Sequence, residues 1–439
     1  MNFLFRISVF FCLVIFIQPS FAGNKRVNSI IPAAQVNQAA SNETVPQLQA
    51  WLAIQENNRT PIDQTGFAQL PLTKDEARQA QDLLWDDYVK SVKTNRKTEW
   101  EQKKFTSGKY SMKYETLQFG QKPVDGWSLY ISLHGGGGAP AEVNESQWKN
   151  QIALGKRYKP DEGIYLAPRA STDTWNLWHQ SHVDDLLDRI ISTLVVMQDV
   201  NPNRVYVMGY SAGGDGVYQL APRMADRWAA ASMMAGHPND AKPDSVRNIG
   251  MTLHVGELDS PYKRNTIILE WKKQLDLLQK NDPEGYQHDV QVHPGKGHWM
   301  DMEDRVAIPW MAKFTRNPLP DRIVWQQDDV THSRFYWLAV GKKDTKPKTE
   351  VIVQKKGQTF TIEKAKDIQE LTIRLNDAMV DMDAPITIRN QDNILFQGVV
   401  PRTINTLYKT IHERGDHASI FSGEIEYPVT TKIENWKIK

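Results

Sequence analysis

The chain has 439 residues, 40% of them hydrophobic, so it is long enough for two or three domains and is neither disordered nor fibrous. Basic and acidic residues nearly cancel to a net charge of +1, which excludes a global positive field for nucleic acid and a polybasic membrane anchor. Neutral or locally recognised substrates are therefore favoured.

The first 22 residues have the pattern of a secretory signal peptide. Arg6 precedes an apolar run at 7–17, and the small-residue pattern at 20–22 predicts cleavage after residue 22. The apolar run is short for a membrane-spanning helix, with an uncleaved anchor as the alternative. We therefore expect a secreted or periplasmic mature chain without stable membrane insertion. Because the only cysteine, Cys12, lies in the removed segment, the mature chain should have no disulfide.

A loosely structured lead-in and a helical arm are expected between residues 23 and 113. Up to about residue 70 the sequence is rich in Asn, Gln and Ala and is interrupted by prolines, with one short helix expected at 47–56. A long amphipathic helix is predicted to begin after Thr73, which can form a capping box with Glu76. We expect this arm to pack on the main domain.

Residues 114–318 alternate short apolar runs with longer helical stretches, and one helix is expected at 183–197. This alternation predicts a mostly parallel sheet flanked by helices, which would form the main α/β domain. The predicted strands are 127–133, 163–167, 205–209, 229–234, 251–255 and 288–292.

The pattern changes at the proline-rich turn 317–320. Beyond it, apolar residues alternate at period two, as in Val351/Val353 and Ile386/Ile388, which is typical of half-buried strands. A small antiparallel β-domain is therefore predicted for residues 319–439, interrupted by a helix at 404–413 and ending with a strand at 419–427.

The strongest chemical signal is the pentapeptide Gly209-Tyr210-Ser211-Ala212-Gly213, which follows an apolar strand and precedes a segment that can be helical. A serine on such a sharp strand-to-helix turn is exposed at the edge of a sheet, and the glycines allow neighbouring elements to approach closely. The helix N-terminus also favours a developing anion. Ser211 is therefore the predicted nucleophile.

A glycine run, Gly135 to Gly138, follows His134 directly after the strand 127–133. Acyl transfer needs backbone N–H donors directed at the tetrahedral oxyanion, and a glycine run can supply them without side-chain obstruction. We expect donors from Gly136 or Gly137 together with Ala212. A plain turn or a phosphate-binding loop is the alternative, the latter disfavoured because no Lys-Ser/Thr pair follows.

A serine hydroxyl is a useful nucleophile near neutral pH only when a base removes its proton. The predicted base is His298, because it lies just beyond the last predicted strand, where this architecture places its base. The third member should follow the strand 251–255, and Asp259 is the predicted residue because the chain order Ser, Asp, His belongs to this fold. The competing residues are His293 and His288 for the base and Glu257 and Asp240 for the acid.

Loops at the carboxyl ends of the strands should form the substrate pocket, where aromatic rings would offer apolar faces to an acyl or aryl group. No His/Asp/Glu grouping has metal-ligand spacing, so no metal and no cofactor are expected. The expected partner is a small-molecule or polymeric ester, and no nucleic acid. The residues predicted to contact substrate are His134, Tyr210, Trp175, Trp178 and His237; for each, a structural role is the alternative.

The elbow at 209–214, the preceding segment 201–207, the loop 133–136 and the element Gly297-His298 together resemble the poly(3-hydroxybutyrate) depolymerase and feruloyl esterase branch of the α/β hydrolases. The resemblance covers about residues 127–310. It implies an α/β-hydrolase fold, a Ser-Asp-His triad and hydrolysis of esters, in some members polymeric or plant-wall esters. The family's disulfide cysteines are absent from this chain.

These observations predict an exported serine hydrolase that cleaves carboxylic esters through an acyl-enzyme intermediate. The same machinery serves peptidases and amidases, so an exported serine peptidase or amidase is one alternative. The other alternative is a catalytically inert binding protein that uses the C-terminal β-domain.

Overall fold

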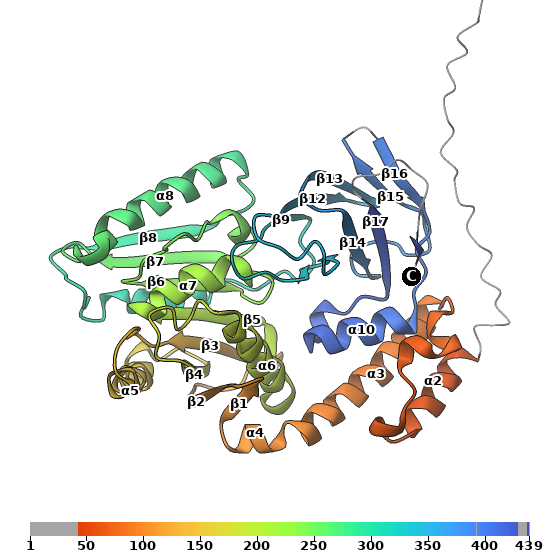
Figure 1. Ribbon diagram of the computed structural model, residues 1–439, viewed down its shortest axis with the longest axis horizontal. Coiled ribbons are helices and arrows are strands. Elements are labelled where there is room, and N and C mark those ends of the chain that lie inside the picture. The colour runs from red at the N-terminus through yellow and green to blue at the C-terminus, as the bar shows by residue number, and fades with distance from the viewer. Residues whose placement is uncertain (1–42, 392, 429–436, 439) are drawn as a thin grey trace, which may run out of the picture.

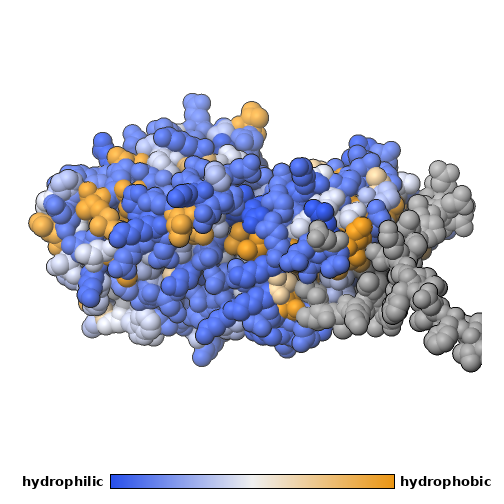
Figure 2. All heavy atoms as spheres, turned by 90° about the horizontal axis from the view of Figure 1, so that it is seen from above, coloured by the Kyte–Doolittle hydropathy of each residue, from blue (hydrophilic) through white to orange (hydrophobic). Residues whose placement is uncertain are grey.

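The computed structural model describes residues 43–391, 393–428 and 437–438, so the predicted signal peptide lies outside the described residues. A layered α/β domain lies beside a β-rich domain, and the first helices pack under the latter (Figure 1). Within the described ranges, no helix combines the length and the apolar character needed to cross a membrane. The face seen in Figure 2 is mostly hydrophilic, with small apolar patches separated from one another.

The main sheet has eight strands in the order β1-β2-β4-β3-β5-β6-β7-β8. β2 pairs antiparallel with β1 and β4, and all other neighbours are parallel. The six strands predicted from the sequence are confirmed, whereas β1 and β2 were not predicted, and β2 contains residue 114, the expected start of this domain. The strands are β1 Lys104–Ser107, β2 Tyr110–Phe119, β3 Trp127–Leu133, β4 Gly163–Arg169, β5 Val200–Tyr210, β6 Ala230–Met234, β7 Gly250–Gly256 and β8 His288–His293.

Helices cover both faces of this sheet (Figure 1), so its central strands are buried on both sides. In β5, Val205 and Val207 belong to the core under α6, α7 and α8, whereas Tyr206 and Met208 pack in the core under α5 and α9. The predicted helix at 183–197 is confirmed as α6. The helices are α5 Ala141–Tyr158, α6 Ser181–Gln198, α7 Ala212–Arg223, α8 Arg264–Asn281 and α9 Ala307–Met311, with 3-10 turns η4 Asp244–Val246, η5 Pro261–Lys263 and η6 Glu303–Val306.

The C-terminal region forms two five-stranded sheets, ordered β10-β11-β14-β17-β18 and β16-β15-β13-β12-β9. Their pairings are antiparallel, as predicted, apart from the parallel pair β13 and β15. The elements are β9 Arg322–Gln326, β10 Arg334–Phe335, β11 Leu338–Val340, β12 Glu350–Lys356, β13 Thr359–Lys366, β14 Glu370–Leu375, β15 Ile386–Asn390, β16 Asn393–Gly398, α10 Ile404–Arg414, η7 His417–Ser419, β17 Gly423–Pro428 and β18 Lys437–Ile438.

The N-terminal arm packs on both domains: the expected contact with the main domain is present, and a core shared with the C-terminal domain was not predicted. At the end of α3, Nη1 of Arg96 donates to the hydroxyls of Ser192 and Thr193 in α6, at 2.8 and 3.0 Å. Thr73 and Glu76 form the predicted capping box, and α3 begins at the next residue after Thr73. Its apolar stripe, including Leu84, shares a core with Leu407 and Ile411 of α10, and Figure 1 shows α3 running under α10. The arm comprises α2 Thr44–Ala53, η1 Glu56–Asn58, η2 Ile62–Gln64, η3 Gly66–Gln69, α3 Lys74–Asn95 and α4 Lys97–Glu101.

Candidate active site

Ser211 lies at the turn between β5 and α7. Its backbone has φ 58° and ψ −121°, a conformation that is costly for a residue with a side chain, and its N–H donates to the Met234 carbonyl at 2.9 Å. A Cβ on Gly209 would collide with the carbonyl of Gly213, so the turn needs a glycine there. This backbone conformation places the hydroxyl of Ser211 at the N-terminus of α7, at the edge of the sheet.

His298 lies in the segment after β8, and its Nε2 is 2.9 Å from Oγ of Ser211. The side chain is 44% exposed, so substrate can reach it. Tyr210 fixes this segment, because its hydroxyl donates to the His298 carbonyl at 2.7 Å and accepts from the Met300 N–H at 3.0 Å. Burial raises the pKa of Tyr210, so this hydroxyl keeps its proton near neutral pH.

Asp259 lies in the loop after β7, and its Oδ2 is 2.8 Å from Nδ1 of His298. The carboxylate is fully buried, and Nη1 of Arg264 lies 3.7 Å from its second oxygen. The Leu258 N–H donates to the Lys296 carbonyl at 2.8 Å, which joins the Asp259 loop to the His298 loop. The structure therefore brings the three predicted residues into one hydrogen-bonded chain.

The four competing residues have other surroundings. His293 is buried and contacts His254, with 3.2 Å between the ring nitrogens, and His288 contacts Asp276 at 3.0 Å. Glu257 is exposed and accepts from the Gly295 N–H at 2.9 Å. Asp240 is exposed too. None of the four takes the place of His298 or Asp259 beside Ser211.

Two glycines of the predicted run have left-handed backbones, Gly136 with φ 113° and Gly137 with φ 117°. A Cβ on Gly136 would collide with Oδ1 of Asn144, so only glycine fits. The Gly137 N–H already donates to Oδ1 of Asn144 at 3.0 Å, so it is not free for an oxyanion, whereas the Gly136 N–H has no acceptor among the described residues. Ala212 begins α7, so helix geometry leaves its N–H unpaired as well.

Two buried side chains hold this glycine loop in place. Asn144 also donates from Nδ2 to the Gly137 carbonyl and to Oδ1 of Asp173, both at 3.0 Å. His134 donates from Nδ1 to the Gly135 carbonyl at 2.6 Å and accepts from the Ala170 N–H at Nε2 at 3.1 Å. Burial lowers the pKa of His134 to about 4, which keeps the ring neutral, as this hydrogen-bond pattern requires.

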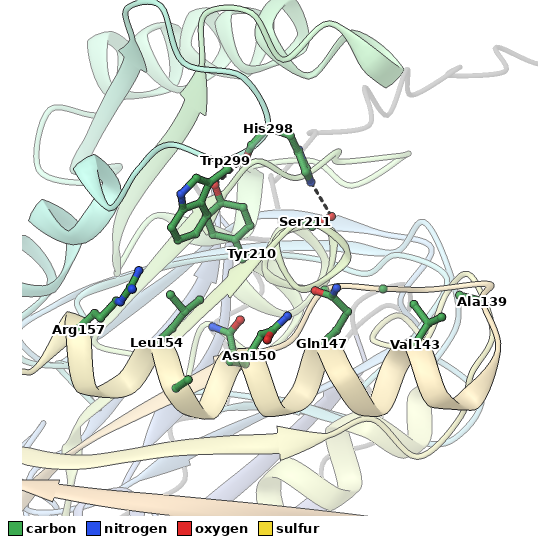
Figure 3. A pocket seen from close by; sticks show the side chains of 14 residues that line it. Ala139, Val143, Gln147, Asn150, Leu154, Arg157, Tyr210, Ser211, His298 and Trp299 are labelled. Atoms are coloured by element: carbon green, nitrogen blue, oxygen red, sulfur yellow. Dashed lines mark hydrogen bonds between the residues drawn. The ribbon is translucent and has the colours of Figure 1, made fainter.

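A pocket of about 690 Å³ opens beside Ser211, between α5 and the segment that carries His298 (Figure 3). Tyr210 is the one predicted substrate residue that lines it. The α5 wall and Trp299 were not predicted from the sequence. The lining residues are Gly135, Gly136, Ala139, Val143, Gln147, Asn150, Gln151, Ala153, Leu154, Arg157, Tyr210, Ser211, His298 and Trp299.

The other predicted substrate residues lie outside this pocket. His134 is buried under the glycine loop, and Trp178 is fully buried and donates from Nε1 to the His134 carbonyl at 2.9 Å, so both have structural roles. His237 accepts from the Asn239 N–H at 3.0 Å, which occupies Nδ1 in a local turn. Trp175 is exposed beside Gly138 and does not line the pocket.

Within the described residues, no three His, Cys, Asp or Glu side chains are grouped to hold a metal ion. No curated protein matches the chain significantly. Three solved structures that it resembles are a thermostable esterase (17% identity, TM-score 0.38, 48% of this chain and 62% of that one), the esterase PE8 (16%, 0.34, 46% and 98%) and a carboxylesterase from Mesorhizobium loti (13%, 0.34, 48% and 99%).

A family model described as the dienelactone hydrolase family matches residues 161–309. The matched segment contains Ser211, Asp259 and His298 and leaves out the glycine loop, α5 and the C-terminal domain. The predicted α/β-hydrolase fold is confirmed, with an additional antiparallel β-rich region, and residues 161–309 are similar to the dienelactone hydrolase family.

Proposed function

We propose that this protein is a serine hydrolase that cleaves carboxylic esters, with Ser211 as nucleophile, His298 as general base and Asp259 as the orienting acid. The observation that carries the proposal is the chain of two hydrogen bonds, 2.9 Å from His298 to Ser211 and 2.8 Å from His298 to Asp259. A hydroxyl becomes a useful nucleophile near neutral pH when a base removes its proton, and this geometry supplies the base.

Asp259 has two physical tasks in this scheme. As acceptor of the Nδ1 proton, it selects the tautomer in which Nε2 of His298 can take the proton of Ser211. Its buried charge also stabilises the imidazolium that forms, because attraction between opposite charges is stronger away from water. Nη1 of Arg264 lies 3.7 Å from the other carboxylate oxygen.

The reaction then proceeds in two halves. Oγ of Ser211 attacks the ester carbonyl while its proton passes to Nε2 of His298, and the oxyanion accepts hydrogen bonds from the N–H groups of Gly136 and Ala212. His298 next gives the proton to the leaving alcohol, and an acyl-enzyme remains. Water, deprotonated by His298, attacks the acyl group and releases the acid and Ser211.

Export and the ester class belong to the same proposal. The pattern of residues 1–22 supports removal of a signal peptide and a periplasmic or secreted enzyme. The motifs at 209–214 and 133–136 support a place near the poly(3-hydroxybutyrate) depolymerase and feruloyl esterase branch, which stays a prediction. Small-molecule esters fit the pocket volume, since such pockets commonly measure about 300–1,000 Å³.

The test is an activity panel on the purified mature protein. p-Nitrophenyl esters from acetate to long chains, methyl ferulate and short peptide p-nitroanilides are compared for the wild type and Ser211→Ala. We expect ester turnover that exceeds peptide turnover, with kcat falling by a factor on the order of 10⁶ in the variant. Ester turnover that survives in folded Ser211→Ala protein would rule out this nucleophile, and peptide turnover alone would favour a peptidase.

A further inference from the structure

One face of α5 forms a continuous wall of the pocket. Seven residues of α5 line the pocket, and five of them follow one another at intervals of four, three, four and three residues, so these five lie on a single stripe of the helix. Figure 3 shows these side chains in a row pointing into the pocket, with Arg157 at the far end from the glycine loop. In chain order they are Val143, Gln147, Asn150, Leu154 and Arg157.

Ser211 lies opposite Gln147 in this row (Figure 3). A Cβ placed on Gly135 would lie 3.2 Å from Cβ of Ser211 and 3.5 Å from Oε1 of Gln147, so both residues border the same part of the pocket. Arg157 is ten residues further along the helix, which is about 15 Å at 1.5 Å per residue. A ligand that contacts both Ser211 and Arg157 must therefore be elongated.

The polar members of the stripe have no protein partners. Gln147, Asn150 and Arg157 make no side-chain hydrogen bond or ion pair with any other residue in the described ranges. Arg264 instead lies near a carboxylate, with its Nη1 3.7 Å from Oδ1 of Asp259. Arginine cannot lose its charge near neutral pH, so Arg157 presents a permanent cation with free N–H donors.

The other pocket residues do not counter this charge. Among the residues that line the pocket there is no Asp or Glu, and the only other ionisable side chains are His298 and Tyr210. A ligand anion at this end would meet a guanidinium suited to carboxylate and phosphate and no lining carboxylate that repels it. The amides of Gln147 and Asn150 could meet polar groups on the way.

We propose that the pocket selects elongated esters that carry an anionic group, such as a carboxylate, far from the ester bond, and that Arg157 binds this group. The inference rests on the proposed ester hydrolysis at Ser211, since the ester is placed opposite Gln147 and the anion about ten helix residues away. Because Arg157 lies far from Ser211, it affects substrate preference and not the chemical step. Because its side chain is exposed, the effect on substrate affinity is modest.

Two series of esters test the proposal. In the first, the acyl chain carries the charge: mono-p-nitrophenyl esters of butanedioic, octanedioic and dodecanedioic acids are compared with neutral p-nitrophenyl alkanoates of equal carbon number. In the second, the alcohol carries it: acetoxyalkanoates are compared with alkyl acetates. We expect kcat/KM to be about fivefold higher for the longer anionic members of one series than for their neutral counterparts. A factor of this size is what one partly exposed ion pair contributes to binding.

Variants assign the preference to Arg157. Arg157→Ala should remove it through a higher KM at unchanged kcat, with neutral esters unaffected, and Arg157→Lys should retain most of it. Lys156→Ala is the matched control, because Lys156 is exposed in the same helical turn but does not line the pocket. Equal turnover of anionic and neutral esters in both series, or a preference that persists in Arg157→Ala, would overturn the proposal.

A binding measurement separates this inference from the proposed function. Calorimetry on Ser211→Ala protein measures the affinity for the monomethyl ester of dodecanedioic acid, with and without Arg157→Ala. Affinity that falls about fivefold in the double variant supports the anion site even if no ester is hydrolysed. An affinity that is the same in both proteins contradicts the site even if Ser211 proves to be the nucleophile.

Discussion

The loops around Ser211 and the α5 stripe border the same pocket, yet they differ in how their polar groups are paired. In the loops, His298 is held by Asp259, and the glycine loop is held by Asn144 and His134. In the stripe, the side chains of Gln147, Asn150 and Arg157 have no partner among the residues that the structure describes.

This difference separates two kinds of function. Groups that act in the transition state gain from being fixed in advance, since they then need no reorganisation during the reaction. Groups that bind the remote part of a substrate can stay solvated until the substrate arrives. Substitutions in the loops should therefore lower kcat, whereas substitutions in the stripe should change KM.

Asp259→Asn should have the largest effect of the substitutions that test this division. Loss of the buried carboxylate favours the wrong tautomer of His298, so kcat should fall about 10⁴-fold with little change in KM. Steady-state kinetics on p-nitrophenyl acetate measure it. Asp240→Asn, at the exposed competing position, is the control and should keep wild-type activity. A fall in kcat of less than tenfold for Asp259→Asn would show that another acid orients His298.

His134 should make the fixed loop sensitive to acid. Burial lowers the pKa of His134 to about 4, against about 6.5 in the unfolded chain, so below pH 6.5 the unfolded state binds the proton more readily. The stabilisation from neutral His134 is fully present above pH about 6.5 and is lost as the pH falls to about 4, a change of about 3 kcal/mol.

His134→Asn is the substitution that measures this dependence. Urea unfolding at pH 7 and pH 4.5 gives the free energy of unfolding for both proteins. The variant should be less stable at pH 7 and should lose less stability on acidification than the wild type. His179 and His254, whose pKa values are also lowered by burial, are present in both proteins, so acid still destabilises the variant through them. Equal losses in the two proteins would mean that His134 does not carry the effect.

Asn144→Ala should release the glycine loop. Without its hydrogen bonds to Gly137, the Gly136 N–H would no longer be held where the oxyanion forms, and kcat should fall about 10- to 100-fold while KM changes little. Asn150→Ala, six residues further along α5, is the control and should leave kcat for a short ester unchanged. A change in KM alone for Asn144→Ala would place Asn144 in substrate binding instead.

Leu154→Ala should have the smallest effect. Leu154 lies on the stripe between Asn150 and Arg157, and its truncation removes apolar contact with long substrates only. KM for p-nitrophenyl decanoate should rise about threefold, with kcat unchanged and p-nitrophenyl acetate unaffected. A lower kcat for the short ester would mean that the stripe also positions the reacting group.

The sequence predicted the parts of this structure that local pattern determines. Apolar runs of strand length identified the six parallel strands, and the residues that follow three of them, Ser211, Asp259 and His298, meet because parallel strands end at the same edge of a sheet. The capping box at Thr73 was likewise a local signal. Each of these predictions depends on residues within a few positions of one another.

Contacts between distant segments could not be predicted in this way. The amphipathic pattern of α3 shows which face is buried but not that α10 covers it. Trp178 and Trp175 follow the same strand with similar side chains, yet one is fully buried and the other is exposed. The stripe on α5 looks like any solvated helix face until the fold places it opposite Ser211. The Gly137 N–H is engaged because Asn144, seven residues away, turns back onto the loop.

The most direct test of the central claim is the reaction of the folded protein with a fluorophosphonate, followed by mass spectrometry of the labelled peptide. We predict a single label on Ser211, much slower labelling in His298→Ala, in which the base is absent, and none in Ser211→Ala. A label on another residue, or labelling of Ser211 that is as fast without His298, would contradict the account.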